Sequence, residues 1–167
     1  TVDHTDPRSP APSAEEVGRG PIPTSLGRFQ SVELVGQDVV LTYRVADATI
    51  RELWKTSEHE GHIVIERHLS VSAHGKDLLL VVGARHQGPS QEIETGVTVS
   101  GPAELVPDDE FFVVKLPTNV APAAICVSLC DEHAAPSIAA VAIPAGPTSR
   151  RWKSLVTTKV ALSSAQD

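Results

Sequence analysis

Histidine and glutamate crowd one short stretch of the chain, Glu58-His59-Glu60-Gly61-His62. Neutral imidazole and carboxylate are ligands that zinc and copper accept, so His59 and His62 with Glu58 and Glu60 form a candidate metal set. No second cluster follows at a characteristic spacing, and a polar run that contains glycine is typical of an exposed turn. We interpret this stretch as a solvated turn and keep a metal site as the alternative.

A second candidate set combines the two cysteines of the chain, Cys126 and Cys130, with His133. Two thiolates and an imidazole suit zinc or copper, but this spacing is not characteristic, and the chain has no Met for the axial position of a blue-copper site. On one strand, residues four apart lie about 13 Å from each other, whereas a disulfide needs Cα atoms within about 7 Å. We predict two free thiols that face one way on a strand, with a metal site as the alternative.

The motifs of catalysis are absent from the sequence. It has no Gly-x-Ser-x-Gly stretch, no C-x-x-C-H motif for c-type haem, and no hydroxyl in a context that would activate it. The run Pro107-Asp108-Asp109-Glu110 clusters carboxylates, as glycosidases and weak calcium sites do, but three adjacent acids before a strand indicate a solvated turn. We assign no catalytic, cofactor-binding or metal residues, and we predict that the chain is not an enzyme.

Composition limits the partners. The chain has 167 residues, 41% of them hydrophobic, a net charge of -7 and a pI of about 5.4. This acidity argues against nucleic acid and anionic lipid, which need clustered Lys and Arg, and no run approaches the ~18 apolar residues of a membrane span. The small basic stretch Ser149 to Lys153, which includes Trp152, suits a contact with a protein partner.

Residues 1–26 are rich in proline and lack any periodicity, so we expect an extended arm. This segment does not have the composition of a signal peptide, and the chain starts with Thr and contains no Met. We therefore expect either a cytosolic chain or an N-terminus made by cleavage or excision, and it is the resemblance given below that implies a periplasmic or extracellular location.

From residue 27 onward the hydrophobic period is two, and turn signals separate short runs. The expected strands lie at 29–35, 39–45, 48–55, 63–73, 78–84, 91–101, 109–117, 123–130, 137–144 and 154–162, with a short helix as the alternative for 137–144. About nine or ten short strands predict an all-β fold, an antiparallel β-sandwich or closed barrel, as one domain over 27–167. The runs 78–84 and 111–116 are apolar on both faces, which predicts covered central strands.

Alternation also predicts which side chains share a face. In the first hairpin, with its turn at Gly36 to Asp38, the expected core residues are Val39, Leu41, Tyr43 and Val45. In the run 63–73, two sets point to opposite faces. The first contains Ile63, Ile65, Leu69 and Val71, with Arg67 interrupting it, and the second contains His62, Glu66, His68 and Ser70.

The first hairpin also carries a resemblance. The stretch GRFQSVELVGQDVVLTYRVADATIRE, Gly27 to Glu52, resembles a segment of large secreted proteins of planctomycete-type bacteria, in which "VVL-x-Y-x-V" introduces a β-rich domain. The stretch RRWKSLVTTKVALSSAQD at 150–167 is similar to the exit strand of that domain. Ser31 and Val32 depart from the family pattern, which has an aromatic residue and a glycine there.

In that family the domain precedes a β-propeller, usually in a polypeptide with a c-type cytochrome module. The resemblance implies a haem-binding or dehydrogenase-like context, but the propeller and the haem motif are absent from this sequence. We therefore expect a noncatalytic β-sandwich module or accessory subunit that docks on a larger extracytoplasmic, cytochrome-containing electron-transfer assembly. The arm offers one way of binding. The alternatives are a carbohydrate-binding or carbohydrate-processing sandwich that uses Trp54 or Trp152, and a small metal-binding protein.

Overall fold

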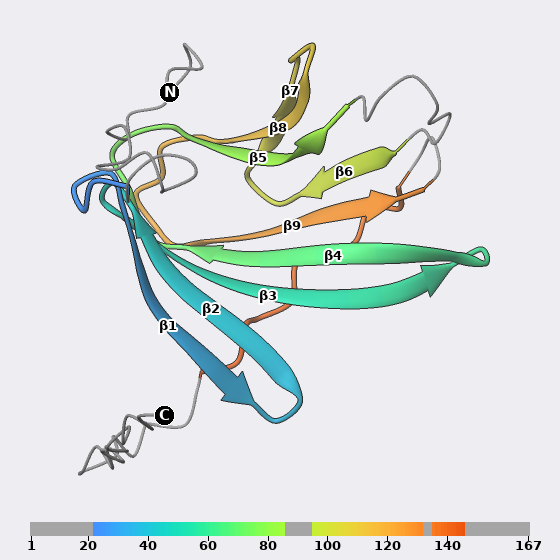
Figure 1. Cartoon of the computed structure of the whole chain (residues 1–167), viewed down its shortest axis with the longest axis horizontal. Coiled ribbons are helices and arrows are strands. Elements are labelled where there is room, and N and C mark those ends of the chain that lie inside the picture. Colours follow the sequence, from blue (N-terminus) through green and yellow to red (C-terminus); the bar gives the residue numbers. More distant parts are fainter. Residues whose placement is uncertain (1–21, 86–94, 132–134, 146–167) are drawn as a thin grey trace, which may run out of the picture.

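The computed structural model describes residues 22–85, 95–131 and 135–145, which form nine strands and no helix (Figure 1). The strands are β1 (Gly27–Val35), β2 (Asp38–Val45), β3 (Ala48–His59), β4 (His62–Val71), β5 (Leu78–Ala84), β6 (Gly96–Ser100), β7 (Glu104–Val106), β8 (Phe111–Leu116) and β9 (Ala123–Cys130). A large sheet has the order β1-β2-β3-β4-β9-β6, a small sheet has the order β5-β8-β7, and every pair is antiparallel. The all-β, sandwich-like prediction is confirmed, and neither sheet closes into the alternative barrel.

Strands β1 to β4 form a meander of three hairpins, each joined by a two-residue turn. Backbone φ is positive in every turn, at Gly36 (66°), Ala46 (50°), Glu60 (53°) and Gly61 (88°). Positive φ in such turns matches the right-handed twist of the strands, so each hairpin holds its register locally. The predicted first hairpin is confirmed.

The core lies between the small sheet and one face of the large sheet, which we call the inner face. It is made by Ala48, Ile50, Leu69, Val71, Ile125 and Val127 of the large sheet and by Leu78, Val114 and Leu116 of the small sheet. Each large apolar side chain buried there contributes roughly 1.5–3 kcal/mol. Tyr43 and Val45 pack against this core as predicted. Val39, which is 44% exposed, and the half-buried Leu41 were also expected there but do not pack against it.

The prediction that β5 is a covered central strand is wrong. It lies at the edge of the small sheet, and Leu79 and Val81 are 45% and 55% exposed. A run that is apolar on both faces can lie at the centre or at the edge of a sheet. Whether its second face is covered depends on distant parts of the chain. The central strand of the small sheet is β8, where Val113 and Val114 are both buried although they point to opposite faces.

Residues 135–145, which we call the strap, are neither the predicted strand nor the alternative helix. The strap crosses the outer face of the large sheet, from β9 past β4 and β3 (Figure 1). Side chains of the sheet bond its backbone: Thr98 and Ser100 donate to the carbonyl oxygens of Ala135 and Ile138, and Arg51 donates to that of Pro144. These bonds replace a strand ladder, to which the prolines of the strap could not contribute N–H groups.

Several expectations fall outside the described residues: most of the arm at 1–26, His133, the stretch Ser149 to Lys153 with Trp152, and the strand at 154–162. Within the described ranges, no helix has the length and apolar character needed to cross a membrane.

The first testable prediction concerns Gly101, directly after β6. Its φ is 93°, and a Cβ atom there would lie 2.3 Å from the carbonyl oxygen of Ala124. Gly101→Ala therefore combines backbone strain with a backbone collision, and we expect it to lower the free energy of unfolding by more than about 4 kcal/mol. Gly36→Ala is the matched control, because Gly36 also has positive φ but a Cβ there would meet nothing within 4 Å.

The control should lose about 1–2 kcal/mol, the cost of the left-handed conformation alone. Urea denaturation of both variants measures the difference. Equal losses would contradict the close approach of the two backbone segments.

Candidate functional site

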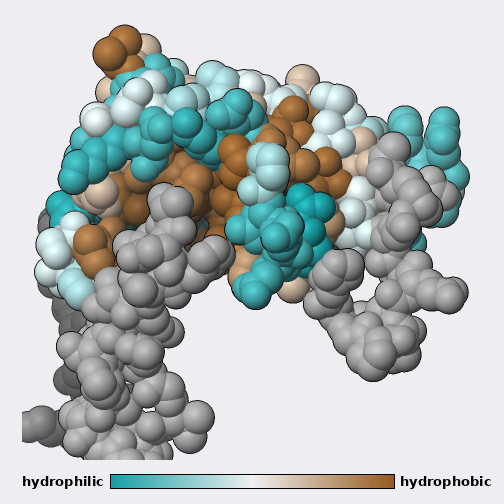
Figure 2. Space-filling model, turned by 90° about the horizontal axis from the view of Figure 1, so that it is seen from above, coloured by the Kyte–Doolittle hydropathy of each residue, from teal (hydrophilic) through white to brown (hydrophobic). Residues whose placement is uncertain are grey.

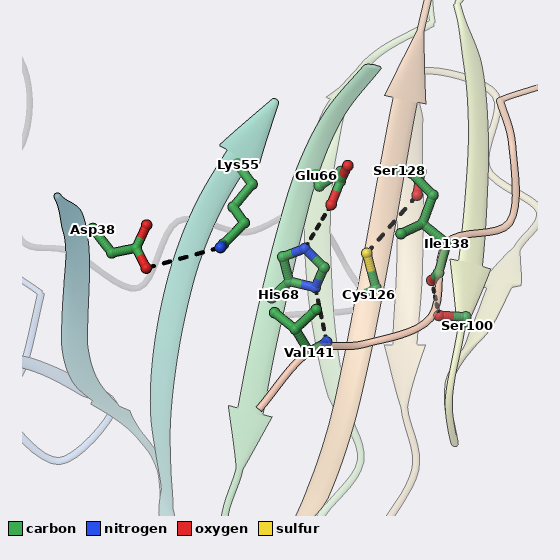
Figure 3. Close-up of polar contacts among 9 residues, drawn as sticks. All are labelled: Asp38, Lys55, Glu66, His68, Ser100, Cys126, Ser128, Ile138 and Val141. Carbon is green, nitrogen blue, oxygen red and sulfur yellow. Dashed lines mark hydrogen bonds and ion pairs between the residues drawn. The ribbon is translucent and has the colours of Figure 1, made fainter. Parts of the chain in front are cut away.

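Three side chains that bind metals or do acid–base chemistry meet on the outer face of the large sheet, beneath the strap. Glu66 and His68 alternate along β4, and Cys126 of β9 lies opposite His68 in the sheet register. One ligand atom from each residue lies within 4.8 Å of the others, and all three residues are buried. Figure 3 shows them pointing toward one another between β4 and β9. We call these three residues the buried cluster.

Hydrogen bonds fix the imidazole of His68. The backbone N–H of Val141, in the strap, donates to Nδ1 over 3.3 Å, so the ring proton resides on Nε2. That proton is donated to Oε2 of Glu66 over 2.7 Å. The strap and the strand thus hold one tautomer and one orientation of the ring.

The thiol of Cys126 is not an activated nucleophile. Burial raises its pKa above the ordinary value, the hydrogen bond with Ser128 opposes this rise, and the charge of Glu66 adds to it. The Sγ atom lies 3.8 Å from Oγ of Ser128, and the residue has no exposed surface. A protonated, inaccessible thiol does not attack a substrate, so in this arrangement the cluster has the chemistry of a metal ligand set more than that of a catalytic triad.

The sequence-based metal set of Cys126, Cys130 and His133 is only partly tested. Both cysteines are free and point to the same face of β9, so the prediction of two unpaired thiols on one strand is confirmed. Cys130 packs in a small apolar cluster with Val64 and Ala135. The cluster with Glu66 and His68 was missed, because alternation placed those residues correctly on the second face of β4 but could not show that the strap covers this face.

The candidate set around His59 and His62 lies at the tip of the β3–β4 hairpin. The two histidines are the last pair of the ladder, and the turn between them is Glu60-Gly61, shorter than expected because β3 continues to His59. Nδ1 of His62 lies 3.2 Å from Oδ1 of Asp131. Among the residues that the structure describes, the group close enough to hold a metal is the buried cluster.

The acidic run before β8 is a turn, as predicted. Oδ1 of Asp108 accepts the backbone N–H groups of Glu110 and Phe111, over 2.9 and 2.8 Å. Asp109 and Glu110 are exposed. The carboxylate of Asp108 therefore orders the entry to β8.

A second polar group lies on the inner face, where the core ends. Glu52 is 3% exposed and accepts hydrogen bonds from the hydroxyl of Tyr43 (2.7 Å) and from Nε of Arg67 (2.8 Å). The guanidinium carbon of Arg67 lies 4.7 Å from the centroid of the Trp54 ring. The signal in the sequence was the pair of charges, Glu52 and Arg67, that interrupt the inward-facing positions of β3 and β4.

Beyond this polar group the inner face of the large sheet exposes apolar side chains, with Thr56 and Glu58 of β3 between them. Strands β1 to β4 present there Val32, Leu34, Val39, Trp54, Ile63 and Ile65, which we call the open face. The most exposed are Leu34 (72%) and Ile63 (68%). A shallow depression of about 330 Å³ adjoins it, lined by Ile63, Ile65 and Leu129 among others. Seen from above, the molecule also has an area where hydrophobic residues gather, with hydrophilic residues around it (Figure 2).

Comparison of the chain with protein-family models, with curated proteins and with solved structures finds no match. The open face and the buried cluster are therefore the features of the chain that point to a function.

The second prediction concerns Tyr43, the single tyrosine of the chain, whose ionisation can be followed by tyrosinate absorbance. Burial, followed by the hydrogen bond to Glu52 and the charge of Glu52, raises the pKa of Tyr43 well above 10.0. We expect no tyrosinate signal at pH 10 while the protein is folded. Because the unfolded chain loses this proton near pH 10 and the native protein keeps it, stability should fall as the pH rises above about 10.

Glu52→Gln should lower the pKa of Tyr43 and leave it above the ordinary value, since burial remains. Glu58→Gln, which removes an exposed carboxylate from the same strand, should leave the titration unchanged. A midpoint near pH 10 in the folded wild-type protein would show that Tyr43 is neither buried nor bonded to Glu52.

Proposed function

We propose that the chain is a noncatalytic β-sandwich module that docks through its open face on a larger protein assembly. The observation that supports this proposal is that four neighbouring strands of one sheet expose apolar side chains on the same face. Scattered single apolar residues are normal on a protein surface, whereas contiguous apolar patches bordered by polar residues mark interaction sites.

The residues at the centre of this face are the types that supply binding energy in protein interfaces. Tryptophan and arginine are enriched among interface hot spots, and Trp54 carries Arg67 over its ring. The bond from Arg67 to Glu52 holds the guanidinium in place before any partner arrives. Binding would then lose little side-chain entropy, because these groups are already ordered.

The edge strand of the large sheet also favours a protein partner. Strand β1 is the last strand on its side of the sheet order, and an edge strand offers backbone donors and acceptors to an added strand. The hairpin's resemblance to the planctomycete domain supports a partner outside the cytoplasm that carries a c-type cytochrome, with the module as a periplasmic or extracellular accessory subunit. The carbohydrate alternative is weaker, because Arg67 occupies one face of the Trp54 ring that a sugar would stack on.

The third prediction tests the open face with two substitutions, Leu34→Asp and Ile63→Asp, in one protein. Both side chains are mostly exposed, so we expect the thermal midpoint of unfolding to change little. Association with the native assembly should be lost, because each carboxylate would have to be desolvated in the interface. The purified chain is mixed with the envelope fraction of the cells that make it. The measurement is whether the chain co-elutes with a component of that fraction as a complex of fixed stoichiometry.

Val120→Asp is the matched control, because Val120 is 99% exposed in the loop before β9 and does not belong to the open face. It should keep the complex. Haem absorbance in the co-eluting complex would support the cytochrome assignment. A complex that survives the double substitution, or a stable dimer of the purified chain that the double substitution dissolves, would overturn docking on a larger assembly.

A further inference from the structure

The buried cluster contains one ligand of each kind found in zinc proteins: a thiol, an imidazole and a carboxylate. We propose that Glu66, His68 and Cys126 form a binding site for a thiophilic divalent cation of the zinc type, closed by the strap. This site differs from the set of Cys126, Cys130 and His133 that the sequence suggests, and it is independent of the open face. Calcium and magnesium do not fit a site with sulfur and nitrogen ligands, because they require oxygen.

The distances are near those that a metal needs. In a tetrahedral zinc site with bonds of about 2.0–2.3 Å, neighbouring ligand atoms lie roughly 3.3–3.8 Å apart. The ligand atoms of the cluster lie within 4.8 Å of one another. Rotations of the side chains can close this difference while β4 and β9 stay in register. Ser128 lies opposite Glu66 on β9, is 1% exposed, and has its hydroxyl oxygen 3.8 Å from the Sγ atom of Cys126, so it is the neighbouring candidate for a fourth ligand.

Charge supports a cation at this place. The carboxylate of Glu66 is 7% exposed, and its hydrogen bond comes from the imidazole of His68, which is neutral in this tautomer. Lys55 lies opposite Glu66 on β3, but its ammonium group lies 3.8 Å from Asp38 (Figure 3). A buried carboxylate without a cation has a large desolvation cost, which a bound metal ion would offset.

Metal binding must be coupled to a movement of the strap. When Nε2 of His68 binds the metal, a neutral ring carries its proton on Nδ1 instead. The N–H of Val141 would then face another donor, so that contact must break, and the strap must shift at Val141. The bonds of Thr98, Ser100 and Arg51 to other strap residues do not involve the ring and can persist. The thiol loses its proton to solvent as the metal–sulfur bond forms.

The experiment uses Co²⁺ as a spectroscopic probe and the full chain with Cys130→Ser. The chain has two cysteines, so in this protein Cys126 is the remaining thiol. We expect one Co²⁺ per chain with a thiolate-to-cobalt charge-transfer band, and displacement of the cobalt by an equimolar amount of Zn²⁺. Cys126→Ser in the otherwise natural chain should lose the band and weaken Co²⁺ binding by at least tenfold.

A folded Cys130→Ser protein that gives no thiolate band at millimolar Co²⁺ would overturn the proposal. A band that Cys130→Ser abolishes and Cys126→Ser keeps would overturn it as well, and would favour a site at Cys130. The role of the strap is tested by Val141→Pro, which removes the N–H that occupies Nδ1 of His68. This variant should take up Co²⁺ faster than the wild type, and slower uptake would contradict the coupling.

Discussion

The hairpin of β3 and β4 packs against a second sheet whose strands are shorter, with 3 to 7 residues each. Strand β3 has 12 residues and spans about 40 Å, whereas the central strand of the small sheet, β8, has 6 residues and spans about 20 Å. The inner face of the large sheet is therefore covered near the β2–β3 turn and open toward the β3–β4 turn. The position of the core, the exposure of the open face and the place of the Glu52–Arg67 pair all follow from this difference in length.

Both buried polar groups lie near the middle of β3 and β4, on opposite faces. On the inner face, Glu52 is satisfied by Tyr43 and Arg67, at the point where apolar packing ends. On the outer face, Glu66 and His68 bond each other beneath the strap. Each group lies on a part of the hairpin that no second sheet covers. Its polar side chains can be buried there because they have hydrogen-bond partners.

The local parts of this fold could be predicted from the sequence, and the covering parts could not. Period-two patterns with Gly36 and Gly61 at the turns specify hairpins, since strand and turn are encoded within a few residues. The edge position of β5 and the path of residues 135–145 depend on contacts with strands far away in the sequence. The same holds for the buried cluster. Alternation put Glu66 and His68 on one face, but neither the proximity of Cys126 nor the covering strap is encoded in that stretch.

The attachment of the strap depends on specific residue types in the sheet more than on residue types in the strap itself. The strap contributes mainly carbonyl oxygens and the N–H of Val141, whereas the sheet contributes the side chains of Thr98, Ser100, Arg51 and His68. Any residue type supplies a carbonyl oxygen, so the exposed positions of the strap tolerate substitution as long as the backbone keeps its path, whereas Ala135 and Ile138 also pack with Val64 and Cys130. The side chains that hold the strap therefore belong to the sheet. A search for distant relatives should give those four positions more weight than the residues of the strap.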